Sequence, residues 1–300
     1  MAISIKGGVM KRREFLIGSA TAAATGSARG QRPDQAKLSR IAVMSLCFET
    51  LLKSAARPND PKRTIAILDL AGVVAERYGI HRVEFQSTDF LSTEAGYFRE
   101  FRSRMKKAKS RINQINLEFA NLNISTPDPV LRLETIDLTK RWIDHAVTLD
   151  CPRVMVAQGT LAPEVRQSAI ETLKTISAYA KTKRVFVTME PRLPWRADAR
   201  PLPWEVLVEV IKASGSYANP DCGNFPDKES RAAGLPVMYK LTAGSSHVKH
   251  VPEKFNTADA IKLSKELGYK GIYTIEERGN NGPDPYAAVQ TILDILLANI

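Results

Sequence analysis

The sequence contains little cysteine and no long hydrophobic run. Its three cysteines in 300 residues allow at most one intramolecular disulfide, and none has CxxC spacing, so a disulfide framework is excluded. No stretch of about 18 uninterrupted apolar residues occurs, so we expect no stable transmembrane span. The 17 glycines and 17 prolines are too few for a collagen-like or low-complexity chain. The composition is therefore that of an ordinary globular protein.

Glycine-rich phosphate loops are also missing. Neither GxGxxG nor GxxxxGK[ST] occurs in the chain, so we expect no dinucleotide or nucleoside triphosphate. The formal net charge is +11, but no long Lys/Arg run or basic–aromatic stripe is present. We therefore expect no nucleic-acid partner and interpret the charge as a solvated basic surface, which would also suit small anionic substrates such as sugar acids.

The first 30 residues have the layout of an export signal. Lys11-Arg12-Arg13 leads into Phe15-Leu16 and an Ala-rich run, which ends in small residues near Ala28. The paired arginines resemble the twin-arginine type of signal, which implies transport of a folded protein by the twin-arginine translocase and a periplasmic or extracytoplasmic location. We therefore divide the chain into a signal peptide (1–30), a linker (31–37) and one folded domain (38–300).

After residue 37, β-branched runs alternate with segments of helical period. This alternation indicates a parallel sheet, and about eight strand–helix units fit the usual size of an α/β (β/α)8 TIM barrel. An open doubly wound sheet is the alternative, but it usually carries a glycine-rich loop after its first strand. The expected strands are 40–47, 82–86, 115–122, 153–157, 184–189, 216–220, 247–251 and 271–275, and the expected helices are 62–78, 129–149, 163–181, 202–213, 256–267 and 284–299.

Four consecutive strands end in groups that can bind a metal ion. The fifth ends at Glu190, the sixth runs into Asp221, the seventh presents His247 or His250, and the eighth ends at Glu276. Because a barrel places its active site at the carboxyl ends of its strands, we expect these side chains to meet. Three carboxylates and an imidazole suit Mn²⁺ or Mg²⁺, and Co²⁺ or Zn²⁺ would also fit.

These motifs resemble the xylose isomerase-like barrels, which include sugar phosphate isomerases and epimerases, ketose 3-epimerases and inosose dehydratases. Asp221-Cys222-Gly223-Asn224 matches the family's Asp-x-Gly-Asn, and His247-Val248-Lys249-His250 matches its His-x-Lys-Asp except at the last position. The resemblance implies that Glu190 and Glu276 bind the metal and that His247, not His250, is its imidazole ligand. The endonuclease IV branch of this fold needs several more histidines than the four present here.

The resemblance also implies a function. Glu190 and Glu276 would remove and return a proton beside a carbonyl group, while the metal stabilises an enediolate, as in a carbohydrate isomerase or epimerase. A lyase on the same barrel and a non-catalytic exported carbohydrate-binding protein are the alternatives. The sequence leaves the oligomeric state open, and Glu84 is a second-tier candidate. The expected substrate-binding residues are Lys249, Asn224, Arg192, Arg278 and Trp195, with Trp204 assigned equally to sugar stacking or helix packing.

Overall fold

The computed structural model describes residues 34–300, with gaps at 54–59, 120–121, 193–201 and 280. The expected signal peptide and residues 31–33 of the expected linker therefore lie outside the described residues. The described part contains eight strands: β1 (Ile41–Met44), β2 (Arg82–Gln86), β3 (Arg111–Asn116), β4 (Arg153–Met155), β5 (Phe186–Met189), β6 (Tyr217–Ala218), β7 (Ser245–Val248) and β8 (Ile272–Ile275).

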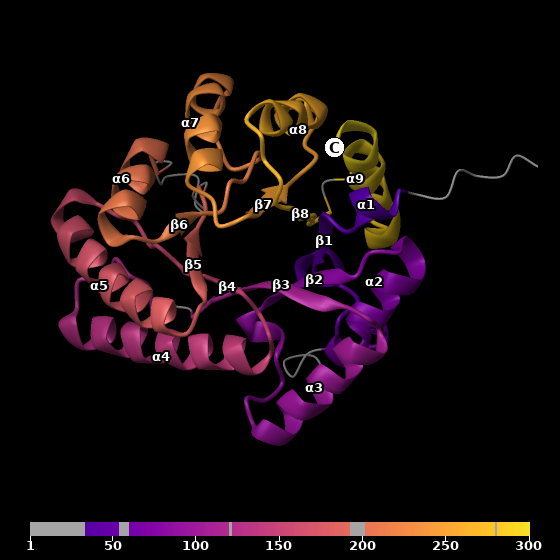
Figure 1. Cartoon of the computed structure of the whole chain (residues 1–300), viewed down its shortest axis with the longest axis horizontal. Helices are drawn as coiled ribbons and strands as arrows, with labels where there is room; N and C mark the ends of the chain where they lie inside the picture. The colour runs from indigo at the N-terminus through magenta and orange to yellow at the C-terminus, as the bar shows by residue number, and fades with distance from the viewer. Residues whose placement is uncertain (1–33, 54–59, 120–121, 193–201, 280) are drawn as a thin grey trace, which may run out of the picture. The chain divides into compact units, whose positions relative to one another are not determined.

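The helices lie outside the strands and cover their outer face (Figure 1). The described α-helices are α1 (Gln35–Leu38), α2 (Leu70–Tyr78), α3 (Ala95–Lys107), α4 (Pro129–Thr148), α5 (Pro163–Thr182), α6 (Trp204–Ser214), α7 (Lys228–Lys240), α8 (Thr257–Glu266) and α9 (Pro285–Asn299). Short 3-10 turns are η1 (Ser45–Phe48), η2 (Ile67–Asp69) and η3 (Ser87–Asp89). Among the described residues, no helix combines the length and apolarity needed to cross a membrane.

All pairs of neighbouring strands are parallel, in the order β6-β5-β4-β3-β2-β1-β8-β7. The two outer strands of this order, β6 and β7, are joined by a parallel bridge between Asp221 and His247 and by a bond from the His247 N–H to the Pro220 carbonyl (2.8 Å). The fold is therefore a single α/β (β/α)8 domain, as the strand–helix alternation predicted. Its closing bridge consists of two of the expected metal ligands.

Several predicted boundaries differ from the structure. The third strand was expected at 115–122 but runs over Arg111–Asn116. The prediction missed its position because the inward side chains of this strand are polar. The helix expected at 62–78 begins only at Leu70, since Ile65 pairs with Leu52 as an isolated bridge. Helices α1, α3 and α7 were not predicted, and α1 includes residues expected in the linker. Helix α7 contains Pro236, which normally interrupts a helix. The other predicted helices agree with the structure to within about two residues at each end.

Candidate metal centre and its pocket

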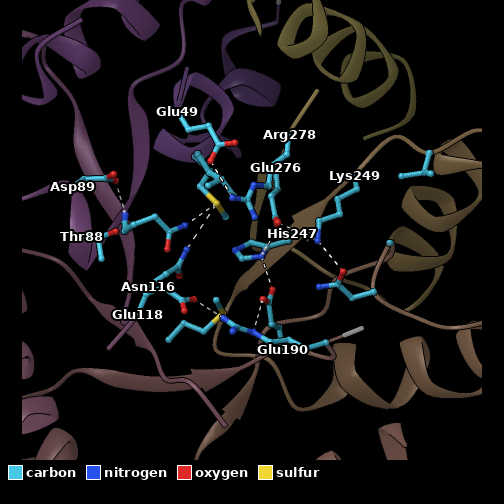
Figure 2. A pocket seen from close by; sticks show the side chains of 18 of the residues that line it. Glu49, Thr88, Asp89, Asn116, Glu118, Glu190, His247, Lys249, Glu276 and Arg278 are labelled. Atoms are coloured by element: carbon cyan, nitrogen blue, oxygen red, sulfur yellow. Dashed lines mark hydrogen bonds and ion pairs between the residues drawn. The ribbon is translucent and has the colours of Figure 1, made fainter. Parts of the chain in front are cut away.

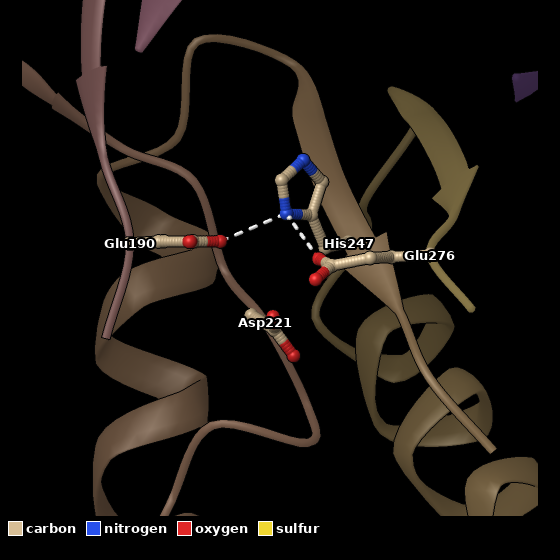
Figure 3. Close-up of side chains that lie close together, drawn as sticks. All are labelled: Glu190, Asp221, His247 and Glu276. Carbon is tan, nitrogen blue, oxygen red and sulfur yellow. Dashed lines mark hydrogen bonds and ion pairs between the residues drawn. The ribbon is translucent and has the colours of Figure 1, made fainter. Parts of the chain in front are cut away.

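Four buried side chains meet at the carboxyl ends of β5 to β8 (Figure 3). Glu190 and Glu276 directly follow β5 and β8, His247 lies in β7, and Asp221 follows β6. Each side chain offers one ligand atom, and these atoms all lie within 4.8 Å of one another. Oxygen and nitrogen ligands on opposite sides of a divalent ion are about 4–5 Å apart. The group can therefore hold one metal ion.

The electrostatics of this group favour a bound cation. His247 Nδ1 lies 2.8 Å from Glu190 Oε2 and 3.0 Å from Glu276 Oε2, yet one N–H cannot serve both acceptors well. Burial alone would lower the pKa of His247, but Glu84 and the other carboxylates raise it well above its ordinary value. Burial also raises the pKa of Asp221 to about 6. A divalent ion would replace the proton and satisfy all four ligands.

Lys249 partly neutralises the same carboxylates. Its Nζ lies 2.8 Å from Asp221 Oδ2 and 3.0 Å from Glu276 Oε1, and it donates a hydrogen bond to Asn224 Oδ1 (2.8 Å). Burial disfavours the ammonium form, but Asp221 and Glu276 outweigh this and hold the pKa of Lys249 above its ordinary value. For Glu276, burial is likewise outweighed, by Lys249 and His247, and its pKa lies well below its ordinary value. Lys249 is therefore a fixed positive charge.

The Asp-x-Gly-Asn segment has a physical reason for each of its three defined positions. Asp221 Oδ1 accepts a hydrogen bond from the Gly223 N–H (2.8 Å), which fixes the carboxylate. A Cβ atom at Gly223 would lie 2.8 Å from Lys249 Cδ, so only glycine leaves room for the lysine stem. Asn224 accepts the hydrogen bond from Lys249. The segment therefore orients the candidate metal ligand Asp221 and the neighbouring ammonium group of Lys249 together.

Three of the four candidate ligands, Glu190, His247 and Glu276, line a pocket of about 570 Å³ (Figure 2). Arg192 Nη2 lies 2.6 Å from Glu118 Oε1, and Arg192 Nε lies 3.3 Å from Glu190 Oε1. At the other side of the mouth, Arg278 Nη2 lies 3.0 Å from Glu49 Oε2. Other lining residues include Gln86, Asp89, Asn116, Asn224, Lys249 and Lys254. Polar side chains therefore dominate the described wall and can hydrogen-bond a polyhydroxylated molecule.

The structure brings most of the expected binding residues to this pocket. Arg192, Asn224, Lys249 and Arg278 line it, whereas Trp195 lies outside the described residues. Trp204 begins α6 and packs against α7, where a Cβ at Gly234 would lie 2.7 Å from its ring. Of the two readings of Trp204, the structure therefore favours helix packing.

Of the histidines, His247 lies in the candidate metal centre, whereas His250 and His145 lie elsewhere. His247, the histidine that the resemblance to the family implied, lies among the carboxylates. His250 points elsewhere, because its Nδ1 lies 3.0 Å from Thr257 Oγ1. His145 packs edge-on against the rings of Phe98 and Trp142, at centroid distances of 5.0 and 5.4 Å, and so has a structural role.

Glu84, a second-tier candidate in the sequence, contacts the candidate imidazole ligand. It is fully buried in β2, and its Oε1 lies 2.6 Å from His247 Nε2. Burial disfavours its charged form, yet the His247 ring and amide donors hold the pKa of Glu84 below its ordinary value. The sequence pattern that could have indicated this is Val83-Glu84-Phe85. Side chains alternate along a strand, so two apolar residues on the outer face place the acid between them on the inner face.

The fold and site together define a TIM barrel with a buried candidate metal centre at the carboxyl ends of its last four strands. The family model for the xylose isomerase-like TIM barrel matches residues 73–296, so the chain belongs to that family. No curated protein matches the sequence.

Solved structures with the same fold carry the names of sugar epimerases. One is a D-allulose 3-epimerase from Methylomonas sp., with 13% identity, a TM-score of 0.69, and coverage of 87% of this chain and 98% of that chain. A D-tagatose 3-epimerase-like protein has 18% identity and a TM-score of 0.66, covering 86% of this chain and 97% of its own. An L-ribulose 3-epimerase has 13% identity and a TM-score of 0.66, with 87% and 95% coverage. At these identities the similarity establishes the fold.

Proposed function

We propose that this protein is a metal-dependent isomerase or epimerase of a carbohydrate, a sugar acid or a polyol. The observation that carries the proposal is the buried group of Glu190, Asp221, His247 and Glu276 beneath a polar pocket. The names of the structural neighbours, which are sugar 3-epimerases, agree with it. Mn²⁺ or Mg²⁺ suits the three carboxylates and one imidazole best, although Co²⁺ and Zn²⁺ also accept such ligands.

The two glutamates are the proposed proton carriers. They lie on opposite sides of His247 Nδ1, and each directs one oxygen toward that nitrogen (Figure 3). The second oxygen of each faces a cation, which is Arg192 for Glu190 (3.3 Å) and Lys249 for Glu276 (3.0 Å). A divalent ion held between the ligands would supply Lewis-acid stabilisation of negative charge on the substrate oxygens. Two bases on opposite faces of one carbon would give epimerisation.

The first experiment combines metal analysis with a substrate search in D₂O. Purified protein loaded with Mn²⁺ is incubated with a panel of sugars, sugar acids and polyols, and the products are analysed by NMR and mass spectrometry. Proton transfer predicts a product of unchanged composition that carries solvent deuterium at the reacting carbon. Complete retention of the original hydrogen in every product would contradict the proposed proton carriers.

Variants of the two glutamates test their roles. Glu190→Gln or Glu276→Gln should lower kcat by at least about 100-fold, the usual contribution of a general acid or base. Glu134→Gln on the exposed face of α4 is the matched control and should retain full activity. Circular dichroism and thermal unfolding establish that each variant is folded. Unchanged turnover in either site variant would refute the assignment.

The same panel distinguishes the two alternative functions. A lyase would release water, so its product would be lighter than the substrate by one water molecule. A carbohydrate-binding protein would hold metal and sugar without any turnover, which calorimetry would detect. Either result would replace the isomerase proposal while leaving the family assignment intact.

We further propose that residues 1–30 direct export through the twin-arginine translocase. The support is the run Lys11-Arg12-Arg13 before an apolar, Ala-rich segment. Replacing Arg12 and Arg13 together by lysine should retain the protein in the cytoplasm of a bacterial host. Cell fractionation with an antibody measures this, and an unchanged distribution would refute the signal.

A further inference from the structure

Glu84 contacts the ring nitrogen of His247 that does not face the three carboxylate ligands. We propose that Glu84 is a positioning residue that holds the Nε2 proton of His247 and so directs the Nδ1 lone pair at the metal ion. This inference rests on the metal centre of the proposed function. It adds a residue from β2, on the far side of the barrel interior, to a site otherwise built from the last four strands.

Glu84 is held in place by donors on both carboxylate oxygens. Its Oε1 lies 2.6 Å from His247 Nε2, and its side chain is fully buried. Four further donors contact the same carboxylate, namely Asn116 Nδ2 (2.9 Å) and Gln114 Nε2 (3.1 Å) on Oε1, and Thr274 Oγ1 (3.0 Å) and Asn113 Nδ2 (3.2 Å) on Oε2. Because these groups donate, Glu84 is present as an acceptor-only carboxylate.

The donor pattern determines the tautomer of His247. An acceptor-only carboxylate at Nε2 requires the proton on that nitrogen, so a neutral ring has its lone pair on Nδ1. Nδ1 is the atom that lies 2.8 Å from Glu190 Oε2 and 3.0 Å from Glu276 Oε2. A carboxylate that accepts from the second nitrogen of a ligating histidine fixes the ring and increases its basicity.

The competing explanation is that Glu84 only fills the barrel interior. That interior is polar here, and Thr188, for example, is fully buried and donates a hydrogen bond to Gln114 Oε1 (2.9 Å). Thr188 has no hydrogen bond to His247, whereas Glu84 does. A purely structural role predicts that Glu84→Gln and Thr188→Val lower stability alike and leave metal binding alone.

Metal titration separates the two explanations. Mn²⁺ binding to wild type, Glu84→Gln and Thr188→Val is measured by calorimetry in the absence of any sugar. We expect Glu84→Gln to bind Mn²⁺ roughly 10- to 100-fold more weakly, the usual effect of losing such a partner, and Thr188→Val to bind as wild type does. Equal affinities in all three proteins would overturn the inference.

NMR of the wild-type protein tests the tautomer without relying on a variant that folds. The protein is loaded with an NMR-active cadmium isotope and contains isotope-labelled histidine, of which the chain has only four. We expect metal coupling at Nδ1 and a proton at Nε2 of one ring, and coupling at Nε2 would overturn the inference. Failure to bind any divalent cation would overturn it as well. Metal binding through Nδ1 without turnover of any sugar would refute the proposed function alone.

Discussion

Lys249 offers the sharpest test of how charge is balanced in the site. Its ammonium contacts Asp221 Oδ2 at 2.8 Å and Glu276 Oε1 at 3.0 Å, and its side chain is only 16% exposed. The change Lys249→Met keeps the unbranched apolar stem of the side chain and removes the ammonium group and its charge. We expect it to destabilise the metal-free protein strongly and the metal-loaded protein much less.

The magnitude follows from these distances. At an effective dielectric constant of about 20, the two contacts give a gross attraction of roughly 11 kcal/mol. The cost of removing three ions from water offsets much of this, and breaking a buried pair by deleting one partner costs about 3–5 kcal/mol net. For a domain of this size, that loss lowers Tm by about 6–10 °C. A bound divalent ion would compensate the same carboxylates, so the loss should shrink when metal is present.

Thermal unfolding at pH 7 measures both states, first with EDTA and then with excess Mn²⁺. Lys174→Met, at an exposed position of α5, is the matched control and should change Tm little in either buffer. By linkage, the smaller loss with metal means that Lys249→Met binds Mn²⁺ more tightly than wild type. A loss of equal size with and without metal would refute this account of Lys249 as a counter-ion.

Three further predictions follow from burial and geometry. The raised pKa of His247 makes a proton compete with the cation, so Mn²⁺ affinity should fall about tenfold per pH unit below that pKa. The fall should be steeper below about pH 6, where Asp221 also binds a proton. Calorimetry measures the affinity, and an affinity independent of pH would contradict this prediction. Burial raises the pKa of all three cysteine thiols, so Ellman's reagent should label them only after unfolding, and rapid labelling of native protein would exclude the described packing. Gly234→Ala should lower the free energy of unfolding by about 1–3 kcal/mol, because the new Cβ would lie 2.7 Å from the Trp204 ring. The control Gly72→Ala places its Cβ in open space and should be neutral or stabilising. Urea titration measures both variants.

Much of the fold could be predicted because helices and strands have local signals. Helix α4 begins with Asp128 as N-cap and Pro129 in its first turn, and it was predicted to within one residue. Strand β3 was misplaced because Asn113 and Asn116 point polar groups into the barrel, where an apolar pattern was expected. Helix α7 was missed because Pro236 hid its period, although its N-cap Asp227 was a usable signal.

The candidate ligands could be predicted for a different reason. Parallel strands of a barrel all end at one rim, so a ligand at the end of each strand implies proximity without knowledge of side-chain contacts. This argument predicted Glu190, Asp221 and Glu276 and left His247 and His250 open, and the resemblance to the family implied His247. It could not rank Glu84, because a residue in the middle of a strand reaches the site only through the packed interior.

The sequence by itself therefore determined the alternation of strands and helices and the order of the four candidate metal ligands along the chain, since both depend on short-range patterns. Only the tertiary structure decided that Nδ1 of His247 faces the carboxylates of Glu190 and Glu276 and that Glu84 contacts the other ring nitrogen. Glu84 and His247 are 163 positions apart in the chain, and closure of the barrel alone brings them within 2.6 Å. Hydrogen-bond geometry at that distance depends on the packed interior, which no local pattern specifies.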